Sequence, residues 1–248
     1  MSDIRPNLLI LGGTTEARRL CQAVAQAGFS GTVSVAGRVQ RPAPQDLPLR
    51  VGGFGGQEGL TRYLQNNGIT HVIDATHPFA AQMSRNAIAA CAQAGIALIA
   101  LIRDPWKQEA SDRWTHVPDI ASAVAALECP PKRILLAVGR MHLQAFTANP
   151  QHFYLVRVVD PPDKPLGFPN AHAVVGRGPF TLEADSALLD THRIDLVVSK
   201  NAGGSGAQAK ILAARQKGLP VLMIARPFIP KRPEAHSVGD VMRWIDHG

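Results

Sequence analysis

The hydrophobic positions of this chain form short apolar runs that alternate with alanine-rich stretches of helical periodicity. In the first hundred residues the runs predict strands at residues 7–11, 31–36, 49–51, 71–75 and 97–102, and the stretches between them predict helices at residues 16–27, 59–66 and 78–94. Strands that alternate with helices are typical of a parallel sheet covered by helices on both faces. We therefore predict an α/β fold for this half.

The same alternation resumes after an interruption. Between Arg103 and Pro118 the periodicity lapses, and beyond it the pattern predicts strands at residues 133–137, 153–158, 195–199 and 221–225 and helices at residues 207–217 and 238–246. We predict two Rossmann-like, doubly wound parallel-sheet units with a cleft between them. The expected division is a unit over residues 1–104, a linker over 105–118 and a second unit over 119–248. Four prolines within residues 160–169 exclude regular structure there, so that segment is either a functional loop or a surface excursion.

Composition narrows the class of protein. Hydrophobic residues make up 46% of the 248 residues and charged residues 18%, which is typical of a globular protein. No apolar run approaches the roughly 18 residues of a membrane span, and the N-terminus lacks the pattern of a signal peptide. The three cysteines form no CxxC pair, and we expect Cys21 and Cys91, which lie inside helical patterns, to be buried, inert thiols. The nine histidines have no ligand spacing, so we expect no metal. We expect a soluble cytoplasmic protein.

The net charge of +7 is compatible with nucleic acid, an anionic membrane or a polyanionic small molecule as partner. The basic residues are dispersed, however, and the sequence has neither a Lys/Arg run nor an aromatic–basic recognition motif. An anionic small molecule is therefore the partner that we expect, with no nucleic acid and no membrane.

The first predicted strand runs directly into a glycine turn and a helix. Gly12-Gly13-Thr14-Thr15-Glu16-Ala17 follows this strand, and a helix N-terminus in that position offers backbone N–H groups and a positive dipole end to a phosphate. Measured against GxGxxG, Gly12 makes the tight turn, Ala17 takes the last small position, and Thr14 replaces the middle glycine. Its hydroxyl could donate to a diphosphate. The alternative is a helix start capped by Thr14 or Thr15 without a ligand.

The end of the second predicted strand indicates which dinucleotide would bind. Gly37 and Arg38 stand where an NAD enzyme usually has an acidic residue for the ribose 2′-hydroxyl, and an arginine suits a 2′-phosphate. NADPH is therefore favoured over NADH. The alternative is an exposed, solvated Arg38.

Two further segments follow predicted strands. The four glycines of Gly52-Gly53-Phe54-Gly55-Gly56 either let the backbone approach a ligand or build a tight turn. Thr76, His77 and Pro78 lie where the fourth strand passes into a helix, with Thr76 as its expected cap and Pro78 in its first turn. His77 either contacts nicotinamide or substrate, or hydrogen-bonds its own turn.

The second half has its own strand–glycine–helix junction at residues 197–206, which includes Lys200, Asn201, Gly203, Gly204 and Ser205. Lys200 and the helix N-terminus would form a receptor for a carboxylate or phosphate. The junction is neither a complete GxSxG elbow nor a Walker A loop, and the chain contains no Tyr-x-x-x-Lys pair. Hydrolase, NTPase and short-chain reductase interpretations are therefore weak.

These segments, together with Arg177-Gly178-Pro179-Phe180, resemble in order and spacing the precorrin-6A reductase family of cobalamin biosynthesis, which includes the cobalt-precorrin-6A reductases. Ala202 departs from the family pattern, where serine is expected. The resemblance implies NADPH-dependent reduction of one C=C bond of the precorrin-6A macrocycle, giving precorrin-6B. That substrate carries many carboxylates, so it is a suitable anionic partner for a protein with an excess of basic residues.

The resemblance also implies roles for residues of this chain. The expected cofactor-binding residues are Gly12, Gly13, Thr14, Thr15, Glu16, Ala17, Gly37, Arg38, Gly53, Thr76 and His77. The expected substrate-binding residues are Arg177, Lys200, Asn201, Gly203, Gly204 and Ser205. His77, Lys200 or water would supply the proton. The alternatives are a cobalt-precorrin-6A reductase that uses NADH and a non-catalytic NADP sensor.

Overall fold

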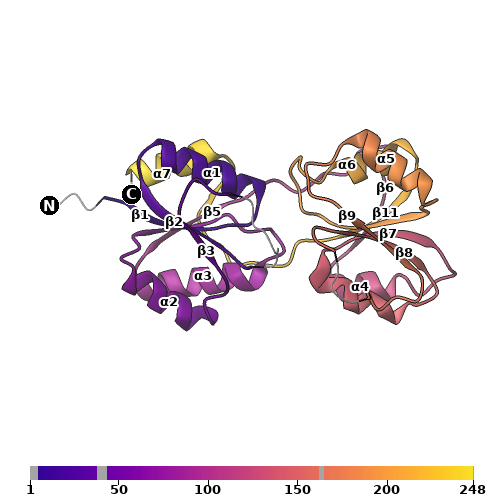
Figure 1. Cartoon of the computed structure of the whole chain (residues 1–248), viewed down its shortest axis with the longest axis horizontal. Coiled ribbons are helices and arrows are strands. Elements are labelled where there is room, and N and C mark those ends of the chain that lie inside the picture. The colour runs from indigo at the N-terminus through magenta and orange to yellow at the C-terminus, as the bar shows by residue number, and fades with distance from the viewer. Residues whose placement is uncertain (1–4, 38–43, 162–164, 248) are drawn as a thin grey trace. The chain divides into compact units, whose positions relative to one another are not determined.

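The computed structural model describes residues 5–37, 44–161 and 165–247, and the chain folds into two compact units (Figure 1). The first unit comprises Met1–Arg103 with Phe228–Gly248, and the second comprises Asp104–Pro227. Each unit contains one six-stranded sheet in which every pair of neighbouring strands is parallel. The predicted α/β class with two doubly wound sheets is confirmed.

The first sheet has the strand order β12-β5-β4-β1-β2-β3. Its strands are β1 (Asn7–Leu11), β2 (Ser30–Val35), β3 (Leu49–Val51), β4 (His71–Asp74), β5 (Ala97–Leu101) and β12 (Glu234–Ala235). Helices α1 (Thr15–Gln26) and α7 (Val238–His247) cover one face, and α2 (Gly56–Asn66) and α3 (Ala81–Ala94) cover the other (Figure 1). The order reverses between β1 and β4, which is where doubly wound sheets bind ligands beyond the carboxyl ends of their strands.

Alternation along β1 builds both halves of the first core. Leu8 and Ile10 pack with α1 and α7, whereas Leu9 and Leu11 pack with α2 and α3. All four side chains are fully buried, as expected for a central strand covered on both faces. Cys21 and Cys91 lie in these cores as free thiols, and burial raises their pKa to about 11 and about 12 respectively. The prediction that these two cysteines are buried is confirmed.

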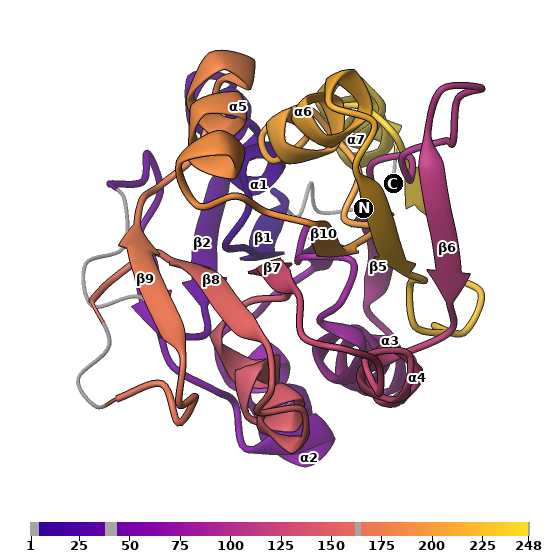
Figure 2. The ribbon, with the colours of Figure 1, turned by 90° about the vertical axis from the view of Figure 1, so that its right-hand side faces the viewer.

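The second sheet has the strand order β6-β11-β10-β7-β8-β9 (Figure 2). Its strands are β6 (Arg113–Val117), β7 (Arg133–Ala137), β8 (Phe153–Val158), β9 (Ala171–Val175), β10 (Leu196–Lys200) and β11 (Pro220–Ile224). Its helices are α4 (Ile120–Ala125), the 3-10 helix η1 (Arg140–Ala148), α5 (Leu182–Thr191) and α6 (Ala209–Gln216). Here the strand order reverses between β7 and β10, so this sheet also has a switch point.

The expected division of the chain is wrong at two places, because the expected linker and the C-terminal segment each supply an edge strand to a sheet. β6 lies within the expected linker, yet it pairs with β11 in the second sheet. β12 and α7 lie within the expected second unit, yet β12 pairs with β5 and α7 packs on α1. The physical reason is the apolar side of α7: Val241 and Ile245 are buried in the first core.

The remaining elements show where local sequence misleads. Helix α3 begins at Ala81 rather than at residue 78, and no side chain caps it. Helix α2 begins at Gly56, inside the glycine segment, three residues before the expected start. Strand β9 escaped prediction because its burial pattern is mostly exposed, as befits the edge strand at the end of the sheet.

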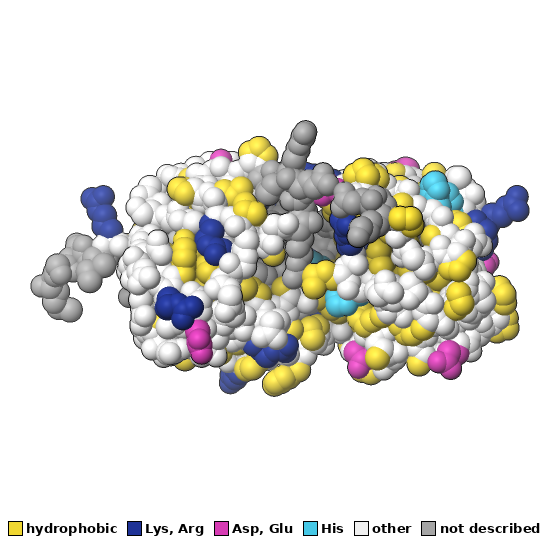
Figure 3. Space-filling view, turned by 60° about the horizontal axis from the view of Figure 1, so that its bottom comes forward, with side chains coloured by type: hydrophobic (Ala, Val, Ile, Leu, Met, Phe, Trp, Pro, Cys, Tyr) yellow, Lys and Arg dark blue, Asp and Glu magenta, His cyan; other side chains and the backbone are white. Residues whose placement is uncertain are grey.

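The distribution of charged side chains and the character of the helices bear on possible partners. On the face drawn in Figure 3, the lysine and arginine side chains are spread among uncharged ones rather than gathered into one patch. Among the residues that the structure describes, no helix has both the length and the apolarity that a membrane crossing requires.

Asp112, just before β6, forms a buried ion pair with Arg215 of α6. Its carboxylate accepts hydrogen bonds from Arg215 Nε at 2.9 Å and Nη2 at 3.0 Å, and from the backbone N–H of Glu109 at 2.8 Å. Burial alone would raise the pKa of Asp112, but these hydrogen bonds outweigh burial and lower it. The carboxylate is therefore ionised in the folded protein and ties the start of the edge strand to a helix.

We expect Asp112→Asn to destabilise the second unit by about 3 kcal/mol, because the substitution leaves the buried Arg215 short of one carboxylate. Since the folded pKa is depressed, the stabilisation is present above the ordinary carboxyl pKa of about 4 and is lost as pH falls below it. Urea unfolding at neutral pH and near pH 3, followed by tryptophan fluorescence, measures both effects. Asp190→Asn, at an exposed pair with Lys217 in the same unit, is the matched control and should change stability by less than about 0.5 kcal/mol.

Candidate functional site

The turn after β1 is built around close packing at Gly12. The Gly12 N–H donates to the carbonyl of Ser34 at 2.8 Å, which fastens the turn to β2. A Cβ on Gly12 would lie 2.9 Å from Cγ2 of Val33 and 3.5 Å from Cβ of Ala17, so only glycine fits. Gly13 has a φ of +107°, and a Cβ there would meet nothing within 4 Å. Gly12 is therefore closely packed within the turn, whereas the space beside Gly13 is open.

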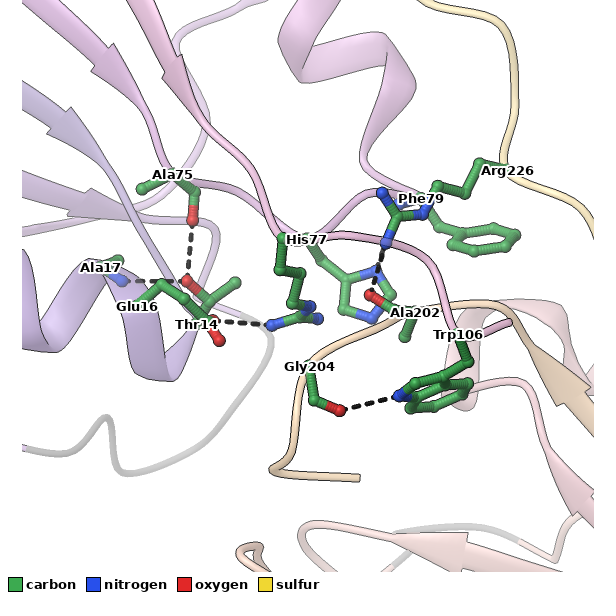
Figure 4. A network of polar contacts seen from close by, with 11 residues as sticks. Thr14, Glu16, Ala17, Ala75, His77, Phe79, Trp106, Ala202, Gly204 and Arg226 are labelled. Atoms are coloured by element: carbon green, nitrogen blue, oxygen red, sulfur yellow. Dashed lines mark hydrogen bonds and ion pairs between the residues drawn. The ribbon is translucent and has the colours of Figure 1, made fainter. Parts of the chain in front are cut away.

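Thr14 caps α1 and joins the turn to β4 (Figure 4). Its Oγ1 accepts from the N–H of Ala17 at 3.1 Å and donates to the carbonyl of Ala75 at 2.8 Å. The hydroxyl proton is used within the protein, so the expectation that it donates to a diphosphate is wrong in this arrangement. The N–H groups of Thr15 and Glu16 still lie in the first helical turn, where the helix itself supplies no acceptor.

Glu16 forms an ion pair with Arg103, which follows β5. The distance from Arg103 Nη1 to Glu16 Oε2 is 2.7 Å, and the two side chains are 19% and 26% exposed. This pair holds the first turn of α1 against the carboxyl edge of the sheet. Glu16 was expected to bind the cofactor, and the structure shows it in a supporting contact.

The carboxyl ends of β2 and β3 are organised by Arg50, which sequence motifs did not single out. Its guanidinium donates to Ser34 Oγ at 3.2 Å and to the carbonyls of Gly52 and Gly53 at 2.7 and 2.8 Å, and it stacks on the ring of Phe54. The glycine loop is therefore shaped by an arginine. Gly37 lies at the end of β2 with a φ of +69°. Arg38 lies outside the described residues.

The end of β4 carries a buried carboxylate, Asp74, that shapes the next loop. Asp74 Oδ1 accepts from the N–H of Thr76 at 3.2 Å and from its hydroxyl at 2.7 Å, and Oδ2 accepts from Ser84 of α3 at 2.6 Å. Thr76 was expected to cap the helix, and this is wrong because its hydroxyl is bound to Asp74. Asp74 itself was not among the predicted site residues, although its place at a strand end was visible.

His77 lies in this loop, and its ring is oriented by the backbone. The N–H of Phe79 donates to His77 Nδ1 at 3.2 Å, and the His77 carbonyl accepts from Ala80 at 2.7 Å. Because Nδ1 accepts a hydrogen bond, the ring proton of neutral His77 resides on Nε2. The structure shows the alternative in which His77 hydrogen-bonds its own turn. In this arrangement Nε2–H is the donor group of the ring.

In the second unit, the loop after β10 is held by Trp106 and Arg226 (Figure 4). The Asn201 amide accepts from the Trp106 N–H at 2.8 Å and donates to the Trp106 carbonyl at 3.0 Å, and Trp106 Nε1 donates to the Gly204 carbonyl at 2.8 Å. Arg226 donates to the carbonyls of Asn201 and Ala202, each at 3.0 Å. Asn201 therefore supports the loop, whereas it was expected to contact substrate.

Gly203 shows how tightly this loop is packed. A Cβ there would lie 2.0 Å from the carbonyl oxygen of Asp104 and 2.5 Å from Nη2 of Arg226, and its φ is +69°. Ser205, by contrast, is exposed. The loop thus has a fixed inner side and an outer side open to solvent.

The other predicted substrate residues lie near this loop. A Cβ on Gly178 would be 3.0 Å from the Gly206 carbonyl, so the segment that contains Arg177 abuts the β10 loop. Arg177 forms an ion pair with Asp160 at 2.9 Å. Lys200 ends β10, and its Nζ lies 4.0 Å from where a Cβ of Gly139 would be. The carboxyl ends of β7 and β10 therefore meet at Lys200, at the switch point of the second sheet.

The structure brings the predicted residues together in two groups, one at the carboxyl edge of each sheet. The first group is Gly12–Ala17, Gly37, Gly53, Thr76 and His77, and the second is Arg177 with Lys200–Ser205. The side chains that support these groups are Arg50, Asp74, Trp106 and Arg226, and their supporting roles are visible only through their contacts.

The strand orders and the glycine turn after β1 define a protein with Rossmann-like units. The chain matches the family described as precorrin-6x reductase CbiJ/CobK over residues 7–246, and it belongs to that family. It is 57% identical to a precorrin-6A reductase of Rhodobacter capsulatus, covering 97% of this chain and 96% of that protein. A cobalt-precorrin-6A reductase of Priestia megaterium is 32% identical, covering 90% and 91%.

Similarity in three dimensions agrees with the sequence relationship. A solved structure described as CobK precorrin-6A reductase is 57% identical and superposes with a TM-score of 0.94, over 98% of this chain and 97% of that one. The resemblance expected from short motifs is therefore confirmed at the level of the family and of the fold.

Proposed function

We propose that this protein reduces one C=C bond of precorrin-6A to give precorrin-6B in cobalamin biosynthesis, with NADPH as the hydride donor. The observation that carries the proposal is the turn from Gly12 to Ala17 at the switch point of the first sheet, in a chain 57% identical to a precorrin-6A reductase. A strand, a close-packed glycine turn and a helix N-terminus are the parts of a dinucleotide site.

The residues present fit a dinucleotide. The open side of Gly13 leaves room for a diphosphate beside the N–H groups of Thr15 and Glu16, and a side chain there would fill that room. When bound, the cofactor supplies a hydride to carbon, which leaves the protein the tasks of orientation and of charge compensation. Gly37 and Gly53 would border the adenosine end, and Thr76 and His77 the nicotinamide end.

The substrate would be held by cations at the edge of the second sheet. Lys200 and Arg177 are suited to the carboxylates of the macrocycle, and Gly203, Gly204 and Ser205 would let the loop backbone approach it. The outer, solvent-facing side of this loop supports that assignment.

A proton must reach the carbon next to the one that accepts the hydride. His77 is poorly suited as its source, because a proton added at Nδ1 would break the hydrogen bond from Phe79. We assign His77 to hydrogen bonding through Nε2–H. Lys200, as an ammonium, is the proposed proton donor.

The choice of NADPH over NADH rests on Arg38. We expect Arg38→Ala to weaken NADPH binding by roughly 1.5–3 kcal/mol while leaving NADH binding nearly unchanged, because a charged hydrogen bond to the 2′-phosphate is lost. Fluorescence titration of both cofactors measures the difference. Equal losses for the two would show that Arg38 does not contact the 2′-phosphate.

The reaction is tested with purified protein, NADPH and precorrin-6A, followed by absorbance of the nicotinamide and of the macrocycle. The expected result is equal consumption of NADPH and precorrin-6A. Binding of NADPH without its oxidation would favour the sensor alternative, and turnover of only the cobalt-containing substrate with NADH would favour the other reductase. Lys200→Gln should slow turnover and leave NADPH affinity unchanged.

A further inference from the structure

Arg232 is a buried arginine whose position the fold by itself does not explain. It lies in the segment that returns from the second unit to the first, two residues before β12. Its side chain is only 7% exposed. Among the described residues, its Nε and Nη1 atoms are buried and have no hydrogen-bond partner. Each such donor costs free energy, so an arginine kept here needs a reason.

The acidic partner of Arg232 is Asp74, at the end of β4. Nη2 of Arg232 lies 3.5 Å from Oδ2 of Asp74, whose side chain is 1% exposed. Strand pairing explains how distant segments meet here: Ala100 of β5 pairs with Asp74 on one side and with Glu234 on the other. The returning segment therefore brings Arg232 beside the β4 carboxylate.

Stability alone gives a weak reason for this pair. Replacement of a buried ion pair by apolar side chains is often neutral or stabilising, because desolvation offsets the attraction between the charges. Asp74, however, has other contacts that extend toward the site. The same carboxylate accepts two hydrogen bonds from Thr76 and one from Ser84, so it fixes the first residue of the Thr76–His77 loop relative to α3.

Arg232 completes the surroundings of that carboxylate. Asp74 Oδ2 is shared by Ser84 and Arg232, which leaves Oδ1 for the backbone and hydroxyl of Thr76. Arg232 thus places a positive charge beside Oδ2, and Oδ1 accepts both bonds from Thr76. The next residue is His77, and Ala75 just before Thr76 is bound by Thr14 of the glycine turn.

We propose that Arg232 is a positioning residue that acts through Asp74 to hold the Thr76–His77 loop where the nicotinamide end of the cofactor lies. This inference rests on the proposed function. It predicts a separation between the two ends of the cofactor site: loss of Arg232 disturbs the nicotinamide end and spares the diphosphate end at Gly12–Ala17.

The test compares Arg232→Met, Asp74→Asn and the double variant in kcat, in NADPH affinity and in the emission of bound NADPH. Each single variant should lower kcat by about 10–100-fold, the scale of a misplaced reacting group, and change the Kd for NADPH by less than about 3-fold. The emission of bound NADPH should return toward that of free NADPH. Because both residues act on one loop, the double variant should be no slower than the slower single variant.

Controls separate positioning from general damage. Arg243→Met removes an exposed arginine of α7, paired with Asp240, and should leave all three measurements unchanged. Arg232→Lys retains a cation near Asp74 and should recover most of the lost kcat. If Arg232→Met does not fold, Asp74→Asn and Arg232→Lys are compared instead. Asp74→Asn should then lower kcat and change the emission of bound NADPH, whereas Arg232→Lys should change neither by much.

Two results would overturn the inference: unchanged kcat and emission in Arg232→Met, or effects of Arg232→Met and Asp74→Asn that multiply in the double variant. Failure of the proposed function looks different, because the wild-type protein itself would then not reduce precorrin-6A. In that case the emission of bound NADPH still decides the role of Arg232.

Discussion

Gly12→Val is expected to abolish useful NADPH binding, with a loss of affinity of about 100-fold or more. The first atom of any side chain at this position would already lie 2.9 Å from Cγ2 of the buried Val33, so that Val33 or the turn must shift. The two further methyl groups of valine would push the turn away from β2 and break the hydrogen bond to Ser34. The N–H groups that should face the diphosphate would then be misplaced.

Gly31→Val is the matched control for this prediction. Gly31 lies at the other end of β2, and its Cβ would be 3.1 Å from the Leu8 backbone carbonyl and from Leu8 Cβ. The control therefore stresses the same pair of strands at the edge away from the site. Isothermal titration with NADPH should show a large loss for Gly12→Val and little change for folded Gly31→Val. Equal losses would mean that the turn acts only through the stability of the sheet.

Gly203→Ala is expected to lower kcat/KM for precorrin-6A by about 100-fold while NADPH affinity stays within about 2-fold of wild type. The new methyl group would overlap the carbonyl of Asp104 at 2.0 Å, so the loop or the facing backbone must move. The left-handed φ of +69° adds roughly 1–2 kcal/mol of strain. Movement of this loop displaces Gly204 and Ser205, and it disturbs the bond from Trp106.

Gly218→Ala is the control that separates the effect of backbone strain from the effect of steric overlap at Gly203. Gly218 has a φ of +61°, and a Cβ there would meet nothing within 4 Å. Its variant should lose stability by roughly 1–2 kcal/mol and keep the kinetics of wild type. Steady-state kinetics with both substrates distinguishes the variants, and a Gly203→Ala protein with normal kcat/KM would remove the β10 loop from the substrate site.

The fold was predictable where local sequence and tertiary structure agree. β1, β3, β7 and β8 have the predicted bounds, since each contains aliphatic residues and is followed by a break in the apolar pattern. The return of the C-terminal segment to the first sheet was not predictable, because nothing in the local pattern of residues 234–247 distinguishes the two sheets that could receive it. Its contacts are long-range, between α7 and α1 and between β12 and β5.

The candidate site was predictable as a set of loops and less so in the role of each side chain. The glycine turn after β1 was identified because close packing requires small residues at positions 12 and 17, and Gly12 and Ala17 are recognisable in the sequence. The hydroxyl of Thr14, the amide of Asn201 and the carboxylate of Glu16 bind other parts of the protein instead. Those partners, Ala75, Trp106 and Arg103, are far away in sequence, so no motif reveals them.

The most direct measurement is a crystal structure of the protein grown with NADP⁺. We expect the diphosphate against the start of α1, beside Gly13, Thr15 and Glu16, with the nicotinamide toward Thr76 and His77. A dinucleotide bound at another place while the Gly12–Ala17 turn stays unchanged and empty would contradict it.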